Sequence, residues 1–235
     1  MKNVMRILAG CLVLSLCFAG GCKGKNAWKP LGPSRSEMEK MAFDPNDPGR
    51  RRQGVGLLSQ RDWGLAEPYL KGYAALLDSD GDPLVRSGAV RALGKAGEAK
   101  YLPNVINALD DRSPGVRWDA AVALDNLIGE EAVDPLRKHA VEDESVDVRA
   151  ACAKALRHYK NKQVVATLKQ CLQDEEFSVR YPAHASLVAV FGSDLGYDHR
   201  RWPDDTIQST TTQPARTGKR PWWDWFNIRN RKREQ

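Results

Sequence analysis

An internal repeat of about 31 residues runs through the middle of this chain. Four segments align with one another: 82–93, 113–124, 145–156 and 177–187. A Val-Arg pair recurs in each at spacings of 31, 32 and 31 residues, and an Asp stands six residues before each Arg. These positions are Asp80, Arg86, Asp111, Arg117, Asp143, Arg149, Asp174 and Arg180. A fixed period of this length predicts a stack of similar units, each of which packs against the next.

Each unit is predicted to contain two helices. Small or apolar residues stand three and seven positions after each Arg, which is the spacing of one buried helix face. They are Ala89 and Leu93, Ala120 and Leu124, Cys152 and Leu156, and Ala183 and Leu187. The other helix of each pair is expected at about 65–77, 98–109, 131–141 and 163–173. Gly94, Gly97, Gly129 and Gly192 are expected to end helices or to form the turns after them.

The pattern Asp-x5-Arg-x2-Ala-x3-Leu resembles HEAT-like repeats, in particular the short type found in phycobilin lyases and in many bacterial scaffolds. The resemblance covers about 47–192, including a degenerate first copy that begins at Asp47 and has Arg51 as its Arg. It implies an all-α superhelix (a HEAT/armadillo-like solenoid) of four to five helical hairpins, with flexible tails.

The same resemblance implies a ladder of Asp and Arg side chains between adjacent repeats. Independently, an Arg beside a buried helix face needs acceptors for its five donors, and the recurring Asp provides them. We therefore expect these residues to be structural, with contact to a ligand as the alternative.

The first 22 residues have the pattern of an export signal. Lys2 and Arg6 precede an apolar run at 7–18, which is shorter than the roughly 20 residues needed to span a bilayer. The ending Gly20-Gly21-Cys22 resembles the lipobox of bacterial lipoproteins, which implies that Cys22 is lipidated and becomes the new N-terminus. A soluble exported protein and an uncleaved anchor are the alternatives.

The charge distribution separates a near-neutral body from two basic ends. Of the formal charge of +6, residues 206–235 contribute +5 and residues 1–21 contribute +2, which leaves −1 for the rest. The basic balance therefore gives no support for nucleic-acid binding by the folded part. We expect a signal peptide at 1–21, a tether at 22–46, the repeat domain at 47–196, a flexible linker at 197–218 and an aromatic-basic tail at 219–235.

The C-terminal tail concentrates aromatic and basic side chains. Four aromatic residues fall within five positions and are followed by a basic cluster: Trp222, Trp223, Trp225 and Phe226, then Arg229, Arg231, Lys232 and Arg233. Such a cluster is costly to expose without a purpose. Three interpretations stay open: contact with a lipid surface, docking into a protein partner, and folding back over the last repeat.

Patterns that would indicate catalysis are missing from the sequence. None of the four His falls in the His-Glu dipeptides of HEAT-like di-iron hydroxylases, and a metal site needs three or four converging ligands. We therefore expect no catalytic residue, no metal and no cofactor. Cys152 replaces a core Ala, and whether it pairs with Cys171 is left open because a bridge depends on their separation.

Aromatic side chains on the Arg-bearing helices indicate a binding surface. Trp118 and Tyr181 directly follow the Arg in two repeats, and the HEAT resemblance places these helices on the concave side, which usually binds partners. Packing between repeats is the alternative. The sequence thus predicts an exported, lipid-anchored, non-catalytic adaptor that holds a protein partner in the bacterial cell envelope. An enzyme or enzyme subunit of the lyase-like branch is the alternative function.

Overall fold

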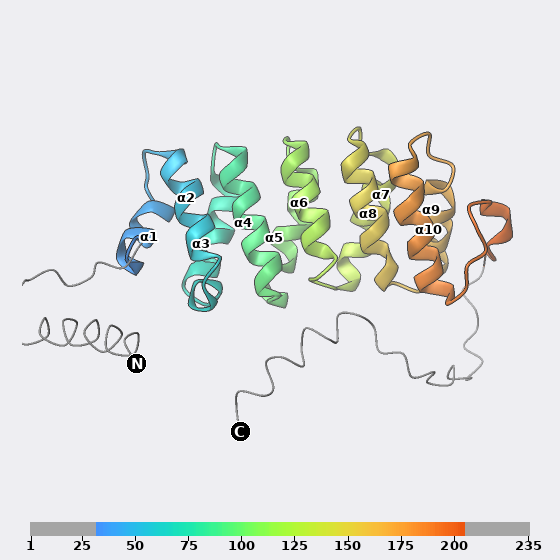
Figure 1. The fold of residues 1–235 in the computed structure, drawn as a ribbon, viewed down its shortest axis with the longest axis horizontal. Helices are drawn as coiled ribbons and strands as arrows, with labels where there is room; N and C mark the ends of the chain where they lie inside the picture. Colours follow the sequence, from blue (N-terminus) through green and yellow to red (C-terminus); the bar gives the residue numbers. More distant parts are fainter. Residues whose placement is uncertain (1–31, 205–235) are drawn as a thin grey trace, which may run out of the picture. The chain divides into compact units, whose positions relative to one another are not determined.

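The described part of the chain is helical throughout. The structure, a computed structural model, describes residues 32–204, and these hold ten α-helices, short 3₁₀ turns and no β-strand (Figure 1). The helices are α1 (Arg35–Ala42), α2 (Pro48–Leu58), α3 (Tyr69–Ser79), α4 (Pro83–Ala96), α5 (Leu102–Asn107), α6 (Pro114–Leu124), α7 (Val133–Glu142), α8 (Val146–Ala155), α9 (Lys162–Cys171) and α10 (Phe177–Phe191). The predicted all-α class is confirmed. Within 32–204, no helix has the length and apolarity to cross a bilayer.

The chain divides into two compact units between Arg61 and Asp62. In the second unit, the helices alternate between two layers (Figure 1). Helices α4, α6, α8 and α10 carry the repeated Arg and pack side by side; we call them the Arg-helix layer. Helices α3, α5, α7 and α9 form the companion layer, so that each consecutive pair is one repeat of a solenoid.

The repeated small and leucine positions form the core between the layers. All eight side chains are fully buried, as the helical spacing predicted: Ala89, Leu93, Ala120, Leu124, Cys152, Leu156, Ala183 and Leu187. Each buried Leu contributes about 1.5–3 kcal/mol relative to an exposed one. The small side chains let neighbouring Arg-bearing helices approach closely, because there is little volume between them.

Local signals set the ends of the helices in the second unit. The Asp82 carboxylate accepts hydrogen bonds from the backbone N–H groups of Leu84 and Val85, which caps the start of α4. Gly97 and Gly192 end α4 and α10 with φ of 70° and 74°, a left-handed conformation that favours glycine.

The expectation that Gly94 ends a helix is wrong, because Gly94 lies inside α4. A Cβ atom at this position would lie 2.5 Å from the Cβ of Ala123 in α6. The residue is therefore small because two helices meet there, a reason that the local sequence does not reveal.

The first unit corrects the predicted tether at 22–46, because residues 35–42 form α1. The Ser34 hydroxyl accepts from the backbone N–H of Glu37, and the Glu37 carboxylate accepts from the backbone N–H of Ser34. Met38 and Ala42 are buried in this unit, where α1 packs against α2. In α2, the Arg51 guanidinium donates to the backbone carbonyl of Asp44, 2.9 Å away.

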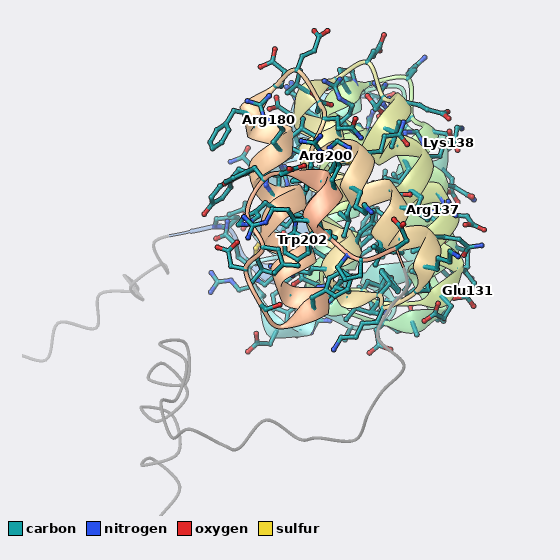
Figure 2. All side chains as sticks on the ribbon, turned by 90° about the vertical axis from the view of Figure 1, so that its right-hand side faces the viewer. Glu131, Arg137, Lys138, Arg180, Arg200 and Trp202 are labelled. Atoms are coloured by element: carbon teal, nitrogen blue, oxygen red, sulfur yellow. The ribbon has the colours of Figure 1, made fainter. Side chains whose placement is uncertain are left out.

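The C-terminal side corrects the predicted linker at 197–218, because residues 198–204 pack onto the last repeat (Figure 2). The Trp202 side chain is 1% exposed, and its indole N–H donates to the carbonyl of Gly196 at 2.8 Å. Its ring lies beside Phe191 and His184 of α10, with centroids 5.5 and 6.0 Å away. The folded domain therefore extends at least to Asp204, where Lys169 of α9 forms an ion pair.

Two glycines of α2 provide a test of the packing in the first unit. A Cβ at Gly54 would lie 2.1 Å from the backbone nitrogen of Ala42, whereas a Cβ at Gly56 would meet no atom within 4 Å. We expect Gly54→Ala to lower the free energy of unfolding by about 1–3 kcal/mol through overpacking. Gly56→Ala should raise it by about 0.5–1 kcal/mol through helix propensity. Urea unfolding measures both, and equal effects would contradict the close contact between α1 and α2.

Candidate binding face

Bidentate ion pairs join each Arg-bearing helix to the following repeat. Arg86 donates through Nε and Nη2 to the Asp111 carboxylate at 2.7 and 2.8 Å. The same two atoms of Arg117 reach Asp143 at 2.8 and 2.9 Å, and those of Arg149 reach Asp174 at 2.8 and 3.1 Å. In each case Nη1 donates to the backbone carbonyl of the Asp six residues earlier; for Arg86 this residue is Asp80.

These pairs are shielded from water, and they lower the pKa of their aspartate carboxyls. The Arg117 and Asp143 side chains are only 9% and 2% exposed. Burial raises the pKa of the Asp143 carboxyl, but hydrogen bonds from Arg117 and from the Ser145 backbone outweigh burial, and the pKa falls below its ordinary range. The same balance lowers the pKa of Asp111 and Asp174. The carboxylates stay ionised and hold adjacent repeats in register.

The last Arg of the series has different surroundings. Arg180 donates through Nη1 to the carbonyls of Asp174 and Glu175, both at 2.7 Å. Within residues 32–204, no carboxylate forms an ion pair with it. Its guanidinium lies 5.5 Å from the ring centroid of Phe177 instead.

The two aromatic residues predicted to bind a partner are both exposed at the surface. Trp118 on α6 is 42% exposed and Tyr181 on α10 is 59% exposed. The structure does not bring them together, because α8 lies between their helices and carries Ala150 at the equivalent position. Neither ring is buried between repeats, so both remain available to another molecule.

Beside Trp118, a second set of ion pairs, which the sequence pattern did not predict, crosses the Arg-helix layer. Arg91 of α4 lies 3.4 Å from the Asp119 carboxylate of α6. Asp125, just after α6, contacts three bases from the following repeat: Lys154 at 3.3 Å, Arg157 at 3.0 Å and His158 at 2.8 Å. The two acids recur in no other repeat, whereas a base stands five residues after the repeated Arg both at Arg91 and at Lys154. The only signal was therefore an Asp on one Arg-bearing helix next to bases on its neighbours.

In this second set, the acids lie below the surface and the bases lie on it. The Asp119 and Asp125 residues are 3% and 8% exposed. The side chains of Arg91, Lys154 and Arg157 are 61%, 53% and 40% exposed. The outward surface is therefore cationic around exposed apolar side chains. We define the binding face by Leu84, Arg91, Trp118, Val122, Lys154 and Arg157.

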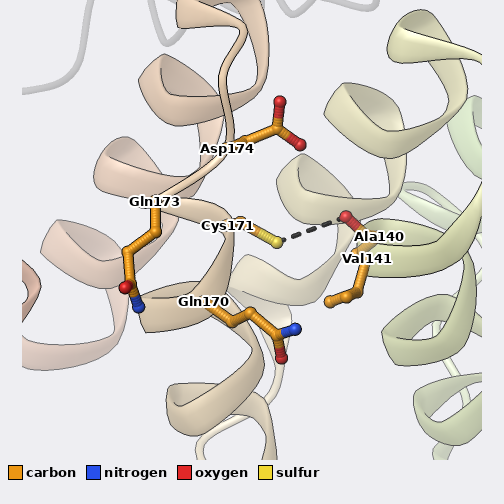
Figure 3. Close-up of a pocket in the computed structure, with 6 residues that line it drawn as sticks. All are labelled: Ala140, Val141, Gln170, Cys171, Gln173 and Asp174. Carbon is orange, nitrogen blue, oxygen red and sulfur yellow. Dashed lines mark hydrogen bonds between the residues drawn. The ribbon is translucent and has the colours of Figure 1, made fainter.

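The companion layer contains a polar cavity of about 470 Å³ between α7 and α9 (Figure 3). Its lining residues are Ala140, Val141, Gln170, Cys171, Gln173 and Asp174. The Cys171 thiol donates to the Ala140 carbonyl at 3.3 Å, and burial raises its pKa to about 12. Burial also raises the pKa of Cys152, and both thiols are free. Protonated, buried thiols are poor nucleophiles, so the cavity offers no activated cysteine.

Histidine rings lie within hydrogen-bonding distance of neighbouring carboxylates. His139 of α7 is buried, with Nδ1 3.0 Å from Asp143 and Nε2 3.2 Å from Asp110, which connects the companion layer to the ladder. His184 of α10 lies 2.8 Å from Asp194. In the part of the chain that the structure describes, no cluster of three or more His, Cys, Asp or Glu is arranged to hold a metal ion.

The fold and the ladder define a helical-repeat protein. Comparison with known families identifies the family of repeats to which it belongs. Residues 70–144 and 134–196 match the family model of HEAT repeats, which covers more than half of the chain. The chain therefore belongs to the HEAT-repeat family.

Two relatives from other organisms share this family. The uncharacterized phycocyanin operon protein Z of Pseudanabaena tenuis is 31% identical over 66% of this chain and 77% of its own length. A HEAT repeat-containing taxis protein of Halobacterium salinarum is 30% identical over 55% of this chain. The match spans only 36% of that taxis protein's length.

Solved structures with the same fold include natural and designed proteins. The complex of CpcE and CpcF of phycocyanin lyase from Nostoc gives a TM-score of 0.60 at 22% identity, covering 69% of this chain and 68% of that chain. A designed armadillo repeat protein in complex with the peptide (KR)4 gives 0.52 at 20% identity, covering 71% and 86%. At these identities the likeness establishes the fold alone.

The remaining predicted site residues, namely Cys22, Trp222, Trp223, Trp225 and Phe226, lie outside the described residues.

Removing a ladder arginine tests its structural role. Arg117→Ala leaves the buried Asp143 carboxylate without its bidentate partner, and we expect the free energy of unfolding to fall by about 3 kcal/mol. The matched control is Arg200→Ala, which removes an arginine that pairs with Asp198 at the exposed surface, and should cost less than about 1 kcal/mol. Similar losses in the two variants, measured by urea unfolding, would contradict the ladder.

The buried Asp119 gives a pH-dependent prediction. Burial raises its pKa, which Ser87 and Arg91 only partly offset, and its Oδ1 has no hydrogen-bond partner. The carboxyl of Asp119 therefore loses its proton at a lower pH in the unfolded chain than in the folded protein. Above the ordinary pKa of an aspartate, the need to bury this charge lowers the free energy of unfolding. We expect Asp119→Asn to raise the free energy of unfolding at pH 7 by about 1 kcal/mol, with the gain shrinking toward pH 3.

Thermal unfolding between pH 3 and 8 measures this gain. The control is Asp147→Asn on α8, an exposed acid that should show no comparable gain. A gain for Asp119→Asn that does not depend on pH would contradict the charged, buried state.

Proposed function

We propose that this HEAT-repeat protein is a non-catalytic adaptor in the bacterial cell envelope. It is held on a membrane through lipidated Cys22 and binds a protein partner on its Arg-helix layer. The observation that carries this proposal is the binding face: Trp118 and Leu84 are 42% and 55% exposed on helices that bury Leu124 and Leu93 on another face. A large aromatic ring on a rigid surface is an effective anchor for a protein partner because little side-chain entropy is lost on binding.

The charges on the binding face favour an acidic partner with apolar side chains. The exposed ends of Arg91, Lys154 and Arg157 lie around the apolar positions, whereas Asp119 and Asp125 lie beneath them. A carboxylate on the partner would meet the cations first, and complementary charge speeds encounter and sets orientation. Proteins of this fold in complex with CpcF and with a peptide support a role in binding proteins.

The start of α1 limits the distance between a lipid on Cys22 and the folded chain. Because α1 is capped by Ser34, about 11 residues separate Cys22 from the first helix, and they reach at most about 40 Å when extended. A lipid on Cys22 would therefore hold the first unit near the membrane surface. A diacylated or triacylated anchor is durable, since each buried CH₂ contributes about 0.8 kcal/mol.

The second candidate function is that of an enzyme or enzyme subunit of the lyase-like branch. It is favoured by the likeness to the phycocyanin lyase complex and to a phycocyanin operon protein. Bilin or iron that stays bound to the purified protein, or turnover, would support this function and exclude the adaptor.

Affinity capture from detergent-solubilised membranes tests the adaptor. We expect one envelope protein to be recovered with the wild type and to be reduced about tenfold with Trp118→Ala, because a buried aromatic anchor contributes about 1.4 kcal/mol or more. The matched control is Ile128→Ala, which removes a 54% exposed apolar side chain from the turn after α6. Equal recovery with both variants would refute the binding face.

The same preparation tests the anchor by mass spectrometry of its N-terminal peptide. A lipidated peptide that begins at Cys22 is expected, and a peptide that begins elsewhere or carries no lipid would refute lipid anchoring.

A further inference from the structure

The ladder of ion pairs is open at its C-terminal end. In three repeats the Nε and Nη2 atoms of the Arg bind a carboxylate of the following repeat, at distances between 2.7 and 3.1 Å. Arg180 occupies the same register on α10, and its Nη1 makes the same backbone contact to Asp174. Its Nε and Nη2 meet no acceptor within residues 32–204. Arg180 therefore has the position of a carboxylate-binding arginine, but no residue in 32–204 supplies the carboxylate.

A group of exposed aromatic rings includes Phe177, which lies against this arginine. Phe177, Tyr181 and Tyr197 are 56%, 59% and 42% exposed. The Phe177 ring lies 6.2 Å from the Tyr181 ring and 5.8 Å from the Tyr197 ring, so the three form one patch. Together with Arg180 they make a surface that suits a carboxylate flanked by aromatic side chains. We call these four residues the end patch.

The segment that packs on the last repeat leaves the end patch uncovered. Trp202 is buried beside Phe191 and His184, and Figure 2 places Trp202 and Arg180 on the same end of the solenoid. Asp198 pairs with Arg200, Asp194 with His184, and Asp204 with Lys169, so the acids of this segment bind other bases.

We propose that the end patch binds residues 222–226 of the same chain, with the Asp224 carboxylate on Nε and Nη2 of Arg180 as a fourth rung of the ladder. Trp222 and Phe226 stand two positions before and after Asp224, so their rings would lie on the same side as the acid in an extended segment. It is the only acidic residue in 206–233, a stretch otherwise rich in bases. Within 206–233, electrostatic attraction to the Arg180 guanidinium therefore favours Asp224 over every other residue.

The length of the tail allows the contact. About 20 residues separate Asp204 from Asp224, and they reach about 66 Å when extended. The described chain ends on the same end of the solenoid as the patch, because Asp204 pairs with Lys169 of α9, which packs against α10. Contact within one chain is also favoured over contact between chains, since a linker of this length gives a high effective concentration.

Hydrogen exchange of the full-length protein, followed by mass spectrometry, tests this contact. Amides in 222–228 should exchange about tenfold faster in Asp224→Asn than in the wild type. Arg180→Gln should produce the same change, and the double variant no further one, because both remove one interaction. The control Glu234→Gln removes the other acid of the tail and should change nothing.

Exchanging the two charges gives the sharper result. Protection should be lost in Arg180→Asp and in Asp224→Arg and recovered when both are combined. Because Asp224 lies outside the repeats, its variants report on the contact even if substitutions at Arg180 loosen α10.

Three outcomes would overturn the proposal. They are equal exchange in the wild type and Asp224→Asn, protection that grows with protein concentration and so indicates a second copy, and protection that appears only with anionic vesicles and so indicates a lipid surface.

Discussion

A guanidinium that is buried at the joint between two repeats depends on the following repeat for its acceptors. Arg117 and Asp143 illustrate this constraint, since each loses most of its contact with water and keeps its charge only because the other is present. Each repeat is thus electrostatically incomplete alone. Because the apolar helix faces are also shared between neighbours, stability arises at the joints more than inside the repeats.

This division of roles explains why the binding face can vary. The buried Ala and Leu positions and the ladder fix the spacing and the register of the Arg-bearing helices. The outward positions do not fix the spacing or the register of the helices, so their side chains can differ between repeats. Trp118, for example, occurs where another repeat has Ala150. Exposed aromatic and cationic side chains on such a rigid support are better explained by binding than by folding.

Periodicity allowed most of the fold to be predicted, and features that occur once were the ones missed. The helix pairs follow from repeated residues, such as Leu124, whose environment recurs in every unit. Helix α1 and the packing of Trp202 have no second copy, so the repeat gives no signal for them. Asp119 and Gly94 owe their environments to contacts between helices, which local spacing does not specify. The exposure of Trp118 and the open end at Arg180 likewise required the packed helices.

The direction of the ladder makes the two ends of the solenoid chemically different. Each Arg reaches forward along the chain to the next Asp, so the final Arg necessarily lacks the partner that a further repeat would supply. Apolar surface at this end is covered by the segment around Trp202, but that segment directs its acids to other bases. The segment that covers the apolar core is therefore not the segment that pairs with the last ladder arginine. The described residues cover the apolar core and leave the Nε and Nη2 donors of Arg180 able to bind a carboxylate.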